Sequence, residues 1–436
     1  MDKETCKKIE GIFVEMKRHL CTCIIPFWYR RIDRENGGFR GYMSYDLEDD
    51  MKAVKGGILN SRILWFFSKA AIAVRDGIIS KEDLAEGGIC EKALGEAAEH
   101  AYKILKDKFY DKENGGIFWS LSYDGKPYDT TKHTYAQAFA IYGLAAFYEL
   151  TGKKDALETA IRLHKKIEEK CHDEGGYGEA FAVDFTPASN EKLSENGVMA
   201  GRTMNTLLHV YEGYSELLRA VTGKEEYKDE AKKLAKELTD MLHTFIEKVY
   251  NKELHRQEVF FDKNWNTLID LWSYGHDIES SWLLDYGMDV LVKAGFEGDF
   301  ADISTECADA LRDLEVTLRE NIFDGNSLPA ECEKGVEKKN RIWWVQAETV
   351  NGFLWNGVKY DDKKDIDCAA AEWAYIKEHS VDKRKGSEWF WELDENGDPI
   401  EGRPIVEEWK CPYHNGRMVL LLLKIVHSRS ECAKVE

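Results

Sequence analysis

Two histidines, each set among aromatic residues, are the side chains of this sequence best suited to proton chemistry. His276 lies between Trp272 and Trp282, and His414 follows Trp409 and Tyr413. Histidine gains and loses a proton near neutral pH, so it serves both as general acid and as general base. Tryptophan offers a flat apolar face that suits the C–H face of a sugar ring. The combination indicates proton transfer on a neutral, ring-shaped substrate.

The spacing around His276 predicts the start of a helix. Ser273 is a suitable N-cap, which places His276 and Glu279 in the first two turns and on one face, with Trp282 on the same face. A helix N-terminus disfavours an added positive charge, so it favours a neutral, basic His276. The alternative for an isolated pair of this kind is a core histidine beside a solvated glutamate.

His414 has a similar setting at the other end of the chain. Pro412 is well placed to open an apolar helix from Met418 to Val426, with His414 at its entrance. A packed turn histidine is the alternative. A zinc site through Cys411 and His414 would need further ligands, and the sequence offers no such cluster. Phosphate-binding and dinucleotide-binding glycine motifs are also missing, so we expect no metal and no cofactor.

Four further segments place a polar or aromatic residue within an apolar helical pattern. Taken singly, each has a structural explanation that is at least as good as a functional one. Taken together, they put one such residue on each of several inner helices, as a central ligand cavity requires. Candidates from these segments are Arg62, Tyr135, Asn205, His209, Trp344 and Glu348. Arg62 stands within an otherwise apolar helix, and a buried arginine needs a partner or a ligand.

Internal repeats predict how these helices are arranged. Glycine-containing turns recur at intervals that leave room for two helices each, the clearest at Gly37-Gly38, Gly115-Gly116 and Gly175-Gly176. Apolar helices alternate with amphipathic ones, as His133–Leu150 does with Asp155–Lys170. Six repeats with an inner and an outer layer predict an all-α fold, a closed (α/α)6 barrel, with an open solenoid as the alternative.

The same pattern of paired helices continues in the next repeat, and a few segments between helices have the pattern of short strands. The pattern predicts an inner helix over Arg202–Val221 and its outer partner over Glu225–Val249. Residues Gly115–Ser122 and Gly176–Phe185 could form short strands. We expect them as β-hairpins in the loops at one mouth of the ring, where functional groups often lie.

Composition restricts the partners of the chain. The 436 residues contain only 7 prolines and no linker-like stretch, so we expect residues 1–436 to form a single domain. The formal charge of -20 disfavours nucleic acid and anionic membranes, and no uncharged run is long enough to span a bilayer. Ten scattered cysteines without a C-x-x-C pair, and the lack of a signal-peptide pattern, predict free thiols in a cytoplasmic protein.

The segments from Gly275 to Leu284 and from Lys410 to Arg417 resemble those of the N-acylglucosamine 2-epimerase superfamily, especially its members that act on cellobiose. The resemblance runs through the whole chain and implies an (α/α)6 barrel. It implies inversion of C2 in the reducing-end glucose of β-1,4-linked disaccharides, such as cellobiose, mannobiose and lactose. The substrate is then a small neutral disaccharide, and we expect a monomer or a weak dimer.

Residue roles also follow from this resemblance. It identifies His276 and His414 as the catalytic pair and Glu279 as the assisting glutamate. The implied substrate contacts are Arg62, Tyr135, Asn205, His209, Trp282, Trp344, Glu348 and Trp409.

The implied chemistry needs these residue types. A C2 proton is acidic only when C1 is a carbonyl, so the sugar ring opens first, and a base then removes the proton to give an enediol or enediolate. Either one base stands on each side of C2, or the intermediate rotates about C2–C3 and one base serves both faces. Arg62 could stabilise the developing oxyanion.

Three other classes of function remain open from the sequence. An N-acylglucosamine 2-epimerase or a mannose isomerase would share the fold and the histidines. A glycoside hydrolase would use two carboxylates, for which Glu279 and Glu348 are the candidates. A non-catalytic carbohydrate-binding protein would need the aromatic residues alone.

Overall fold

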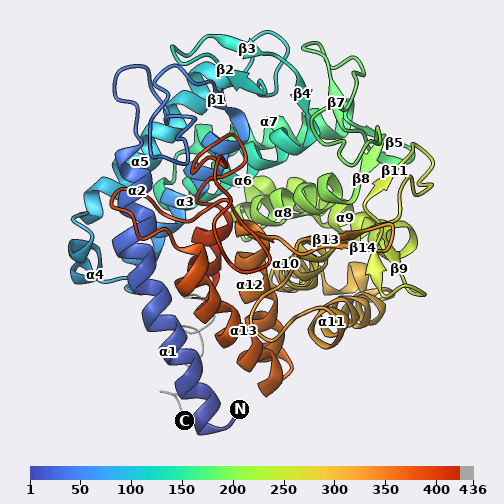
Figure 1. Ribbon diagram of the computed structural model, residues 1–436. Helices are drawn as coiled ribbons and strands as arrows, with labels where there is room; N and C mark the ends of the chain where they lie inside the picture. The colour runs from blue at the N-terminus through green and yellow to red at the C-terminus, as the bar shows by residue number, and fades with distance from the viewer. Residues whose placement is uncertain (423–436) are drawn as a thin grey trace.

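The computed structural model describes residues 1–422 of the chain, and most of them are helical (Figure 1). The α-helices are α1 (Lys3–His19), α2 (Ile25–Arg30), α3 (Gly57–Arg75), α4 (Lys81–Glu86), α5 (Glu91–Ile104), α6 (Thr134–Thr151), α7 (Lys154–Lys170), α8 (Met204–Val221), α9 (Lys228–Thr244), α10 (Tyr274–Lys293), α11 (Ser304–Asn321), α12 (Trp343–Lys359) and α13 (Lys363–Tyr375). Residues 414–422 are helical as well. Short π-helical turns follow four of these helices, at Leu20–Ile24, Leu105–Phe109, Phe245–Val249 and Ile376–Ser380.

The helices form two concentric layers. Helices α3, α6, α8, α10 and α12 pack in sequence against one another, and each packs on an outer helix that follows it, namely α5, α7, α9, α11 and α13. Fourteen of the eighteen residues of α6 are buried, against eight of the seventeen in α7. This difference is what the apolar and amphipathic patterns predict, because an inner helix has neighbours on all sides.

The ring is closed by the two ends of the chain. The helix at residues 414–422 completes the inner layer, since Gly416 packs on Phe66 of α3 and His414 on Trp343 of α12. Helix α1 packs on α13 and completes the outer layer, as the blue and orange helices of Figure 1 show. Within residues 1–422, six inner helices therefore face six outer ones, and the predicted closed (α/α)6 barrel is confirmed over the open solenoid.

Short strands line one mouth of the barrel. They are β1 (Lys55–Gly56), β2 (Ser120–Leu121), β3 (Pro127–Asp129), β4 (Lys132–His133), β5 (His172–Asp173), β6 (Gly176–Tyr177), β7 (Ala180–Phe181), β8 (Arg202–Thr203), β9 (Tyr250–Asn251), β10 (Arg256–Gln257), β11 (Phe260–Phe261), β12 (Leu271–Ser273), β13 (Glu331–Glu333), β14 (Val336–Lys338), β15 (Arg341–Ile342) and β16 (Glu392–Leu393). All pairings are antiparallel, in the sheets β1-β2-β3, β12-β13-β14, β4-β7, β5-β6, β8-β11, β9-β10 and β15-β16. Strands β1, β4, β8, β12 and β15 each lead directly into an inner helix, so these strands fix where the inner helices begin.

Ion pairs repeat around this mouth and tie glycine turns to the inner helices that follow them. Lys55 before α3 pairs with Asp33 at 2.7 Å, and Lys132 before α6 pairs with Asp111 at 3.0 Å. Arg341 before α12 pairs with Asp324 at 2.7 Å in the same way. Each of these aspartates also accepts backbone N–H bonds from its own turn. The repeat seen in the sequence is thus a repeated device that anchors the starts of the inner helices.

Gly116 shows why these turns require glycine. Its φ of +74° is a left-handed conformation, and an added Cβ would lie 2.7 Å from the ring of Phe185. The Gln137 side chain of α6 reaches this turn and accepts a hydrogen bond from Ile117 N at 2.6 Å. A larger residue at position 116 would push α6 away from its turn.

Several smaller predictions can now be compared with the structure. The nine cysteines among the described residues are free thiols, as predicted. Within residues 1–422, no helix is both long enough and apolar enough to cross a membrane. The helix predicted for Met418–Val426 begins earlier, at His414, and its last four predicted residues lie outside the described part of the chain.

Candidate active site

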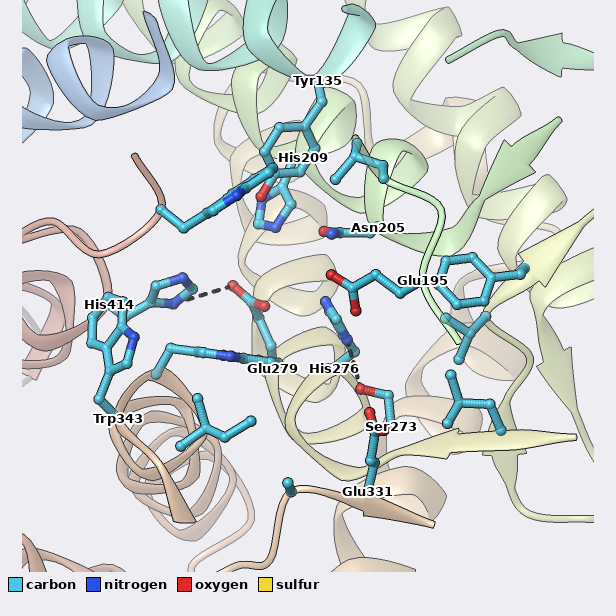
Figure 2. A pocket seen from close by; sticks show the side chains of 18 of the residues that line it. Tyr135, Glu195, Asn205, His209, Ser273, His276, Glu279, Glu331, Trp343 and His414 are labelled. Carbon is cyan, nitrogen blue, oxygen red and sulfur yellow. Dashed lines mark hydrogen bonds and ion pairs between the residues drawn. The ribbon is translucent and has the colours of Figure 1, made fainter. Parts of the chain in front are cut away.

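A cavity of about 240 Å³ opens where the inner helices begin. Nine of the eleven predicted site residues line it: Arg62, Tyr135, Asn205, His209, His276, Glu279, Trp344, Trp409 and His414. They come from all six inner helices and from the loop that precedes the last one. The positive ends of six helix dipoles therefore converge on this cavity and favour negative charge within it. Figure 2 shows His276 and His414 on opposite sides of the space, with Glu279 between them.

His276 lies in the first turn of α10, as its spacing from Ser273 predicts. Ser273 occupies the N-cap position, but its hydroxyl makes no capping bond and instead lies 2.7 Å from His276 Nδ1. The serine fixes the imidazole, which leaves Nε2 free to face the cavity. Burial, reinforced by the nearby His209, lowers the pKa of His276 to about 3, so the ring is neutral at neutral pH and has a lone pair with which to accept a proton.

The next residue of the motif, Asp277, points away from the cavity. It accepts bonds from Trp272 Nε1 at 2.7 Å and from Gln257 Nε2 at 3.0 Å. Gln257 Nε2 also donates to the carbonyl of His276. Burial raises the pKa of Asp277 to about 7. Its contacts hold the start of α10 in place, which is a structural task.

His414 is the first residue of the last inner helix and is 6 % exposed. Its Nδ1 lies 2.7 Å from Glu348 Oε1 of α12, whereas Glu279 Oε1 is 4.0 Å away. Burial, together with the cationic Arg62 and Arg417, holds the pKa of His414 well below its usual range, and the Glu212 carboxylate acts in the opposite direction. The two predicted catalytic histidines are therefore both neutral, but only His414 has a carboxylate on its second nitrogen.

Glu279 is almost fully buried and has one oxygen available for a ligand. Its Oε1 accepts from the Arg417 guanidinium, and its Oε2 has no hydrogen-bond partner among the described residues. Burial, reinforced by the Glu348 carboxylate, raises the pKa of Glu279 above its usual range despite the nearby Arg417. A proton carried on Oε2 would face the cavity.

Arg62 brings a positive charge into the cavity without a carboxylate to balance it. It is 1 % exposed, it donates to the Tyr135 hydroxyl at 2.8 Å and to the carbonyl of Trp409 at 3.4 Å, and its Nε has no partner within residues 1–422. The guanidinium lies over the rings of Phe139 and Tyr413. A buried cation is costly unless an anion balances it, so the site is prepared for negative charge on a ligand.

Helix α8 contributes two polar side chains to the opposite wall. His209 Nδ1 lies 2.9 Å from Glu212 Oε2, and burial lowers the pKa of His209. Asn205 lies one turn earlier, lines the cavity, and has a buried Oδ1 without a partner among the described residues. Both are placed to bind sugar hydroxyl groups, because unpaired polar atoms in a cavity are satisfied by a ligand.

The Trp344 ring forms part of the cavity wall and lies close to both candidate catalytic histidines. Its ring centroid is 4.8 Å from that of His276 and 5.6 Å from that of His414. Gly275 makes this contact possible, since an added Cβ would lie 2.5 Å from the Trp344 ring. The Trp409 ring, edge-on to Tyr135, forms another aromatic wall. Half-buried tryptophan faces of this kind suit sugar rings.

Two of the predicted substrate contacts, Trp282 and Glu348, are not among the side chains that line the cavity. Trp282 is 2 % exposed and donates from Nε1 to Glu348 Oε2 at 3.0 Å. Glu348 is fully buried behind His414. Helical spacing places Trp282 on the same face of α10 as Glu279. Trp282 lies about one turn further along the helix, however, and the cavity does not extend that deep into the barrel. Glu348 holds His414 from behind, and Trp282 in turn holds Glu348.

Two carboxylates that the sequence did not indicate also face the cavity. Glu195 comes from the loop between β7 and β8, and Glu331 from β13 (Figure 2). Burial, reinforced by Glu331, raises the pKa of Glu195. Neither a loop nor a strand of three residues gives a periodic pattern, so no pattern in the sequence pointed to this pair.

Among residues 1–422, two groups of side chains lie close enough together to be compared with metal-binding sites. Glu279, Glu348 and His414 form one of them, but the Arg417 guanidinium already donates to both carboxylates, so this group does not fit a cation. The other group, His164, Glu168 and Glu237, lies in the outer layer, where His164 is hydrogen-bonded to Glu237 at 2.6 Å.

Comparison with known proteins extends the similarity over almost the whole chain. The family model for N-acylglucosamine 2-epimerase (GlcNAc 2-epimerase) matches residues 37–414. A cellobiose 2-epimerase from Eubacterium cellulosolvens is 48% identical over 93% of this chain and 97% of its own. The solved structure of cellobiose 2-epimerase from Bacillus thermoamylovorans B4167 is 35% identical, covers 95% of this chain and 99% of its own, and gives a TM-score of 0.85.

A solved D-mannose isomerase is only 18% identical, with a TM-score of 0.71 over 95% of this chain and 97% of its own, and it shares the fold. The family match and the 48% identical relative both cover well over two thirds of the chain. With the barrel and its histidine-lined cavity in place, the chain belongs to the N-acylglucosamine 2-epimerase family.

Proposed function

We propose that this protein is a cellobiose 2-epimerase, which reversibly inverts C2 of the reducing-end glucose in β-1,4-linked disaccharides. The main support for the proposal is the arrangement of His276, His414 and Arg62 around one cavity. Two neutral imidazoles supply bases, and a guanidinium without a carboxylate partner supplies a place for an oxyanion. The cellobiose 2-epimerases that the chain resembles support the choice of substrate.

Ring opening is the first step, and it needs a proton delivered to O5 and one removed from O1. Glu279 is suited to the delivery, because its raised pKa keeps a proton at neutral pH and its Oε2 is unpartnered. A neutral histidine is suited to the removal. The open-chain sugar then carries a carbonyl at C1.

Removal of the C2 proton follows and places negative charge on O1. Arg62 would bind this enediolate oxygen, aided by the helix N-termini that converge on the cavity. A base whose imidazolium is stabilised by a carboxylate holds the abstracted proton more easily, and His414 has such a partner in Glu348. His276 has only the Ser273 hydroxyl.

Return of a proton to the opposite face of C2 completes the inversion. With both histidines on one cavity, His276 can protonate the face opposite His414. Alternatively, rotation about C2–C3 presents the second face to His414 alone. Solvent-exchange measurements on single-histidine variants separate these routes, because a single-base route survives loss of the other histidine.

The cavity lining supports a neutral sugar over an anionic one. Among residues 1–422, Arg62 is the one lysine or arginine that lines the cavity, while Glu195 and Glu331 add carboxylates to its lining. A phosphorylated sugar would meet these carboxylates, whereas neutral hydroxyl groups can donate to them. Trp344, Trp391 and Trp409 offer apolar faces for the sugar rings.

The carboxylate geometry argues against a glycoside hydrolase. Such enzymes place two carboxyl groups on either side of the scissile bond, roughly 5–9.5 Å apart. Here Glu279 and Glu348 both bind the same Arg417 nitrogen, and Glu348 is buried behind His414. They stand on one side of the cavity and cannot flank a glycosidic bond.

The test is product analysis after incubation with cellobiose, mannose and N-acetylglucosamine in parallel. The proposal predicts conversion of cellobiose to glucosyl-mannose, with much slower or no reaction of the two monosaccharides. Fructose from mannose as the main product would favour a mannose isomerase, and N-acetylmannosamine would favour an N-acylglucosamine 2-epimerase. Release of glucose would mark a hydrolase.

A further inference from the structure

One buried arginine lies at the centre of the carboxylates behind the cavity. Arg417 is 2 % exposed and does not line the cavity. Its Nη1 donates to Glu212 Oε1 at 2.6 Å, and its Nη2 donates to Glu348 Oε1 at 2.8 Å and to Glu279 Oε1. The three glutamates come from α8, α12 and α10, so this guanidinium joins three inner helices to the last one.

Each of these glutamates is linked to a histidine of the cavity. Glu348 Oε1 accepts from His414 Nδ1 at 2.7 Å. Glu212 Oε2 lies 2.9 Å from His209 Nδ1. Glu279 Oε1 is 4.0 Å from His414 Nδ1. A single cation therefore stands behind the hydrogen bonds that orient two of the three cavity histidines.

The charge balance of the cluster depends on the same cation. Three carboxylates lie together out of contact with solvent, and like charges at this range repel strongly. Burial alone would raise the pKa of Glu212, yet Arg417 and the bond with His209 outweigh it and hold the pKa at about 2. Without Arg417, we expect the pKa of Glu212 to rise, because that cation would no longer offset the burial of this carboxylate.

We propose that Arg417 is a positioning residue, which sets the orientation and ionisation of the glutamates that hold His414 and His209 without touching the substrate. This inference rests on the proposed epimerase function. It concerns a residue whose place in the sequence motif suggested no role of its own.

The proposal predicts a characteristic kinetic pattern. Arg417→Lys keeps a cation but cannot bridge the glutamates with a planar fork. Loss of geometry in a catalytic site costs roughly 10²-fold in rate, so kcat for cellobiose should fall by about 10- to 100-fold. KM should change less than about 3-fold, because Arg417 lies outside the cavity lining. Arg417→Gln should lose more activity than Arg417→Lys, because the lysine retains the positive charge.

The pH profile gives a second, independent signature. His414 can hold its Nδ1 proton against Glu348 only when that carboxylate is ionised. Removing the positive charge raises the pKa of the neighbouring carboxylates, so the acid limb of kcat in Arg417→Gln should move to higher pH. A residue with a merely structural role would lower activity at all pH values alike.

Arg219→Lys is a matched control in the same barrel. Arg219 lies at the far end of α8, where it also bridges two glutamates, Glu149 at 2.7 Å and Glu216 at 2.9 Å. The same substitution should there leave kcat, KM and the pH profile within about twofold of the wild type. Thermal unfolding of all three variants reports whether the fold is retained, and Arg417→Lys carries the test if Arg417→Gln does not fold.

Imidazole ¹⁵N spectra of the unliganded protein test the inference without any turnover. In the wild type, His414 and His209 should be neutral with the proton on Nδ1, and in Arg417→Lys this tautomer or its pH dependence should change. Unchanged ¹⁵N signals together with wild-type kcat and acid limb would overturn the role of Arg417. A wild type that does not epimerise cellobiose, but shows the ¹⁵N change in the variant, would instead overturn the proposed function alone.

Discussion

His276 and His414 differ in what holds their second nitrogen, and this difference shapes the proposed chemistry. Ser273 holds His276, and Glu348 holds His414. A hydroxyl can accept or donate and adds no charge, whereas a carboxylate stabilises an imidazolium. We therefore expect His414 to hold the abstracted proton for longer than His276 does.

Removing either imidazole should stop turnover but preserve the barrel. A positioned general acid or base contributes roughly 10²–10⁴-fold, so His276→Ala and His414→Ala should each lower kcat for cellobiose by at least about 10²-fold. Circular dichroism and thermal unfolding should remain close to wild type. Near-normal turnover by His414→Ala would show that this mechanism is wrong.

Some residues of the cavity could be predicted from the sequence, and others could not. His276, Glu279 and His414 could be predicted, because helix starts have local signatures and the two motifs are specific to a family. Glu195 and Glu331 could not, since loops reach the cavity through contacts distant in sequence. Trp282 was assigned to the substrate because periodicity fixes the face of a helix but not how deep a cavity extends along it.

At the scale of elements, the outer helices α7 and α9 are linked by a buried histidine. His164 Nδ1 lies 2.8 Å from Glu230 Oε1 and Nε2 lies 2.6 Å from Glu237 Oε2. Burial would lower the pKa of His164, but the two carboxylates outweigh it and raise the pKa to about 9. Despite its burial, the bond with His164 lowers the pKa of Glu230, so the fold stabilises the ionised form of this carboxylate. Burial raises the pKa of Glu237, which offsets part of this stabilisation.

This link predicts a pH-dependent contribution to stability. Because the folded-state pKa of His164 exceeds its ordinary value, the stabilisation is fully present below pH ~6.5 and is lost as pH rises through about 9. His164→Gln should lower the free energy of unfolding by on the order of 2 kcal/mol at pH 6, and the loss should vanish by about pH 10. Denaturant unfolding at both pH values measures it.

His243→Gln is the control for this experiment. His243 lies on α9, the helix that carries Glu230 and Glu237, and it is half-exposed, with Asp302 3.6 Å away. Its replacement should change the free energy of unfolding by less than about 0.5 kcal/mol at either pH. An equal loss at pH 6 and pH 10 in His164→Gln would show that packing, and not charge, is what His164 provides.

The helices themselves were largely predictable, and their ends were not. The pattern predicted His133–Leu150 and Asp155–Lys170, and the structure has α6 and α7 within one residue of these bounds. Glu225–Val249 was predicted as one helix, but it is a 3₁₀ turn, α9 and a π turn. The outer helices α5, α9 and α13 all end in such π turns, which have no distinct sequence signature.

At the scale of the whole molecule, the protein is strongly acidic, whereas its proposed substrate carries no charge. The formal charge is -20, yet a neutral disaccharide feels no long-range force from it. We predict that KM for cellobiose changes less than about twofold between 0.05 and 0.5 M NaCl, because salt screens only interactions between charges. A KM that rises steeply with salt in initial-rate measurements would indicate a charged substrate instead.

The barrel explains how distant residues come to share one reaction. His276 and His414 are separated by about two repeats in the sequence, yet each stands in the first turn of an inner helix, with α12 between the two helices. Closing the ring brings the last helix beside α3 and α12, which sets Arg62 and Glu348 around His414. The repeats predicted the ring, whereas which side chains meet at its centre depends on packing that the repeats do not encode.

The most direct test of the two-histidine account is proton exchange at C2. Cellobiose is incubated with the wild-type protein in D₂O, and NMR follows the reducing-end sugar. The account predicts that deuterium enters C2 as glucosyl-mannose appears, that the glycosidic bond stays intact, and that His276→Ala and His414→Ala slow interconversion by at least about 10²-fold. Inversion without solvent deuterium at C2, with undiminished rates in both variants, would contradict it.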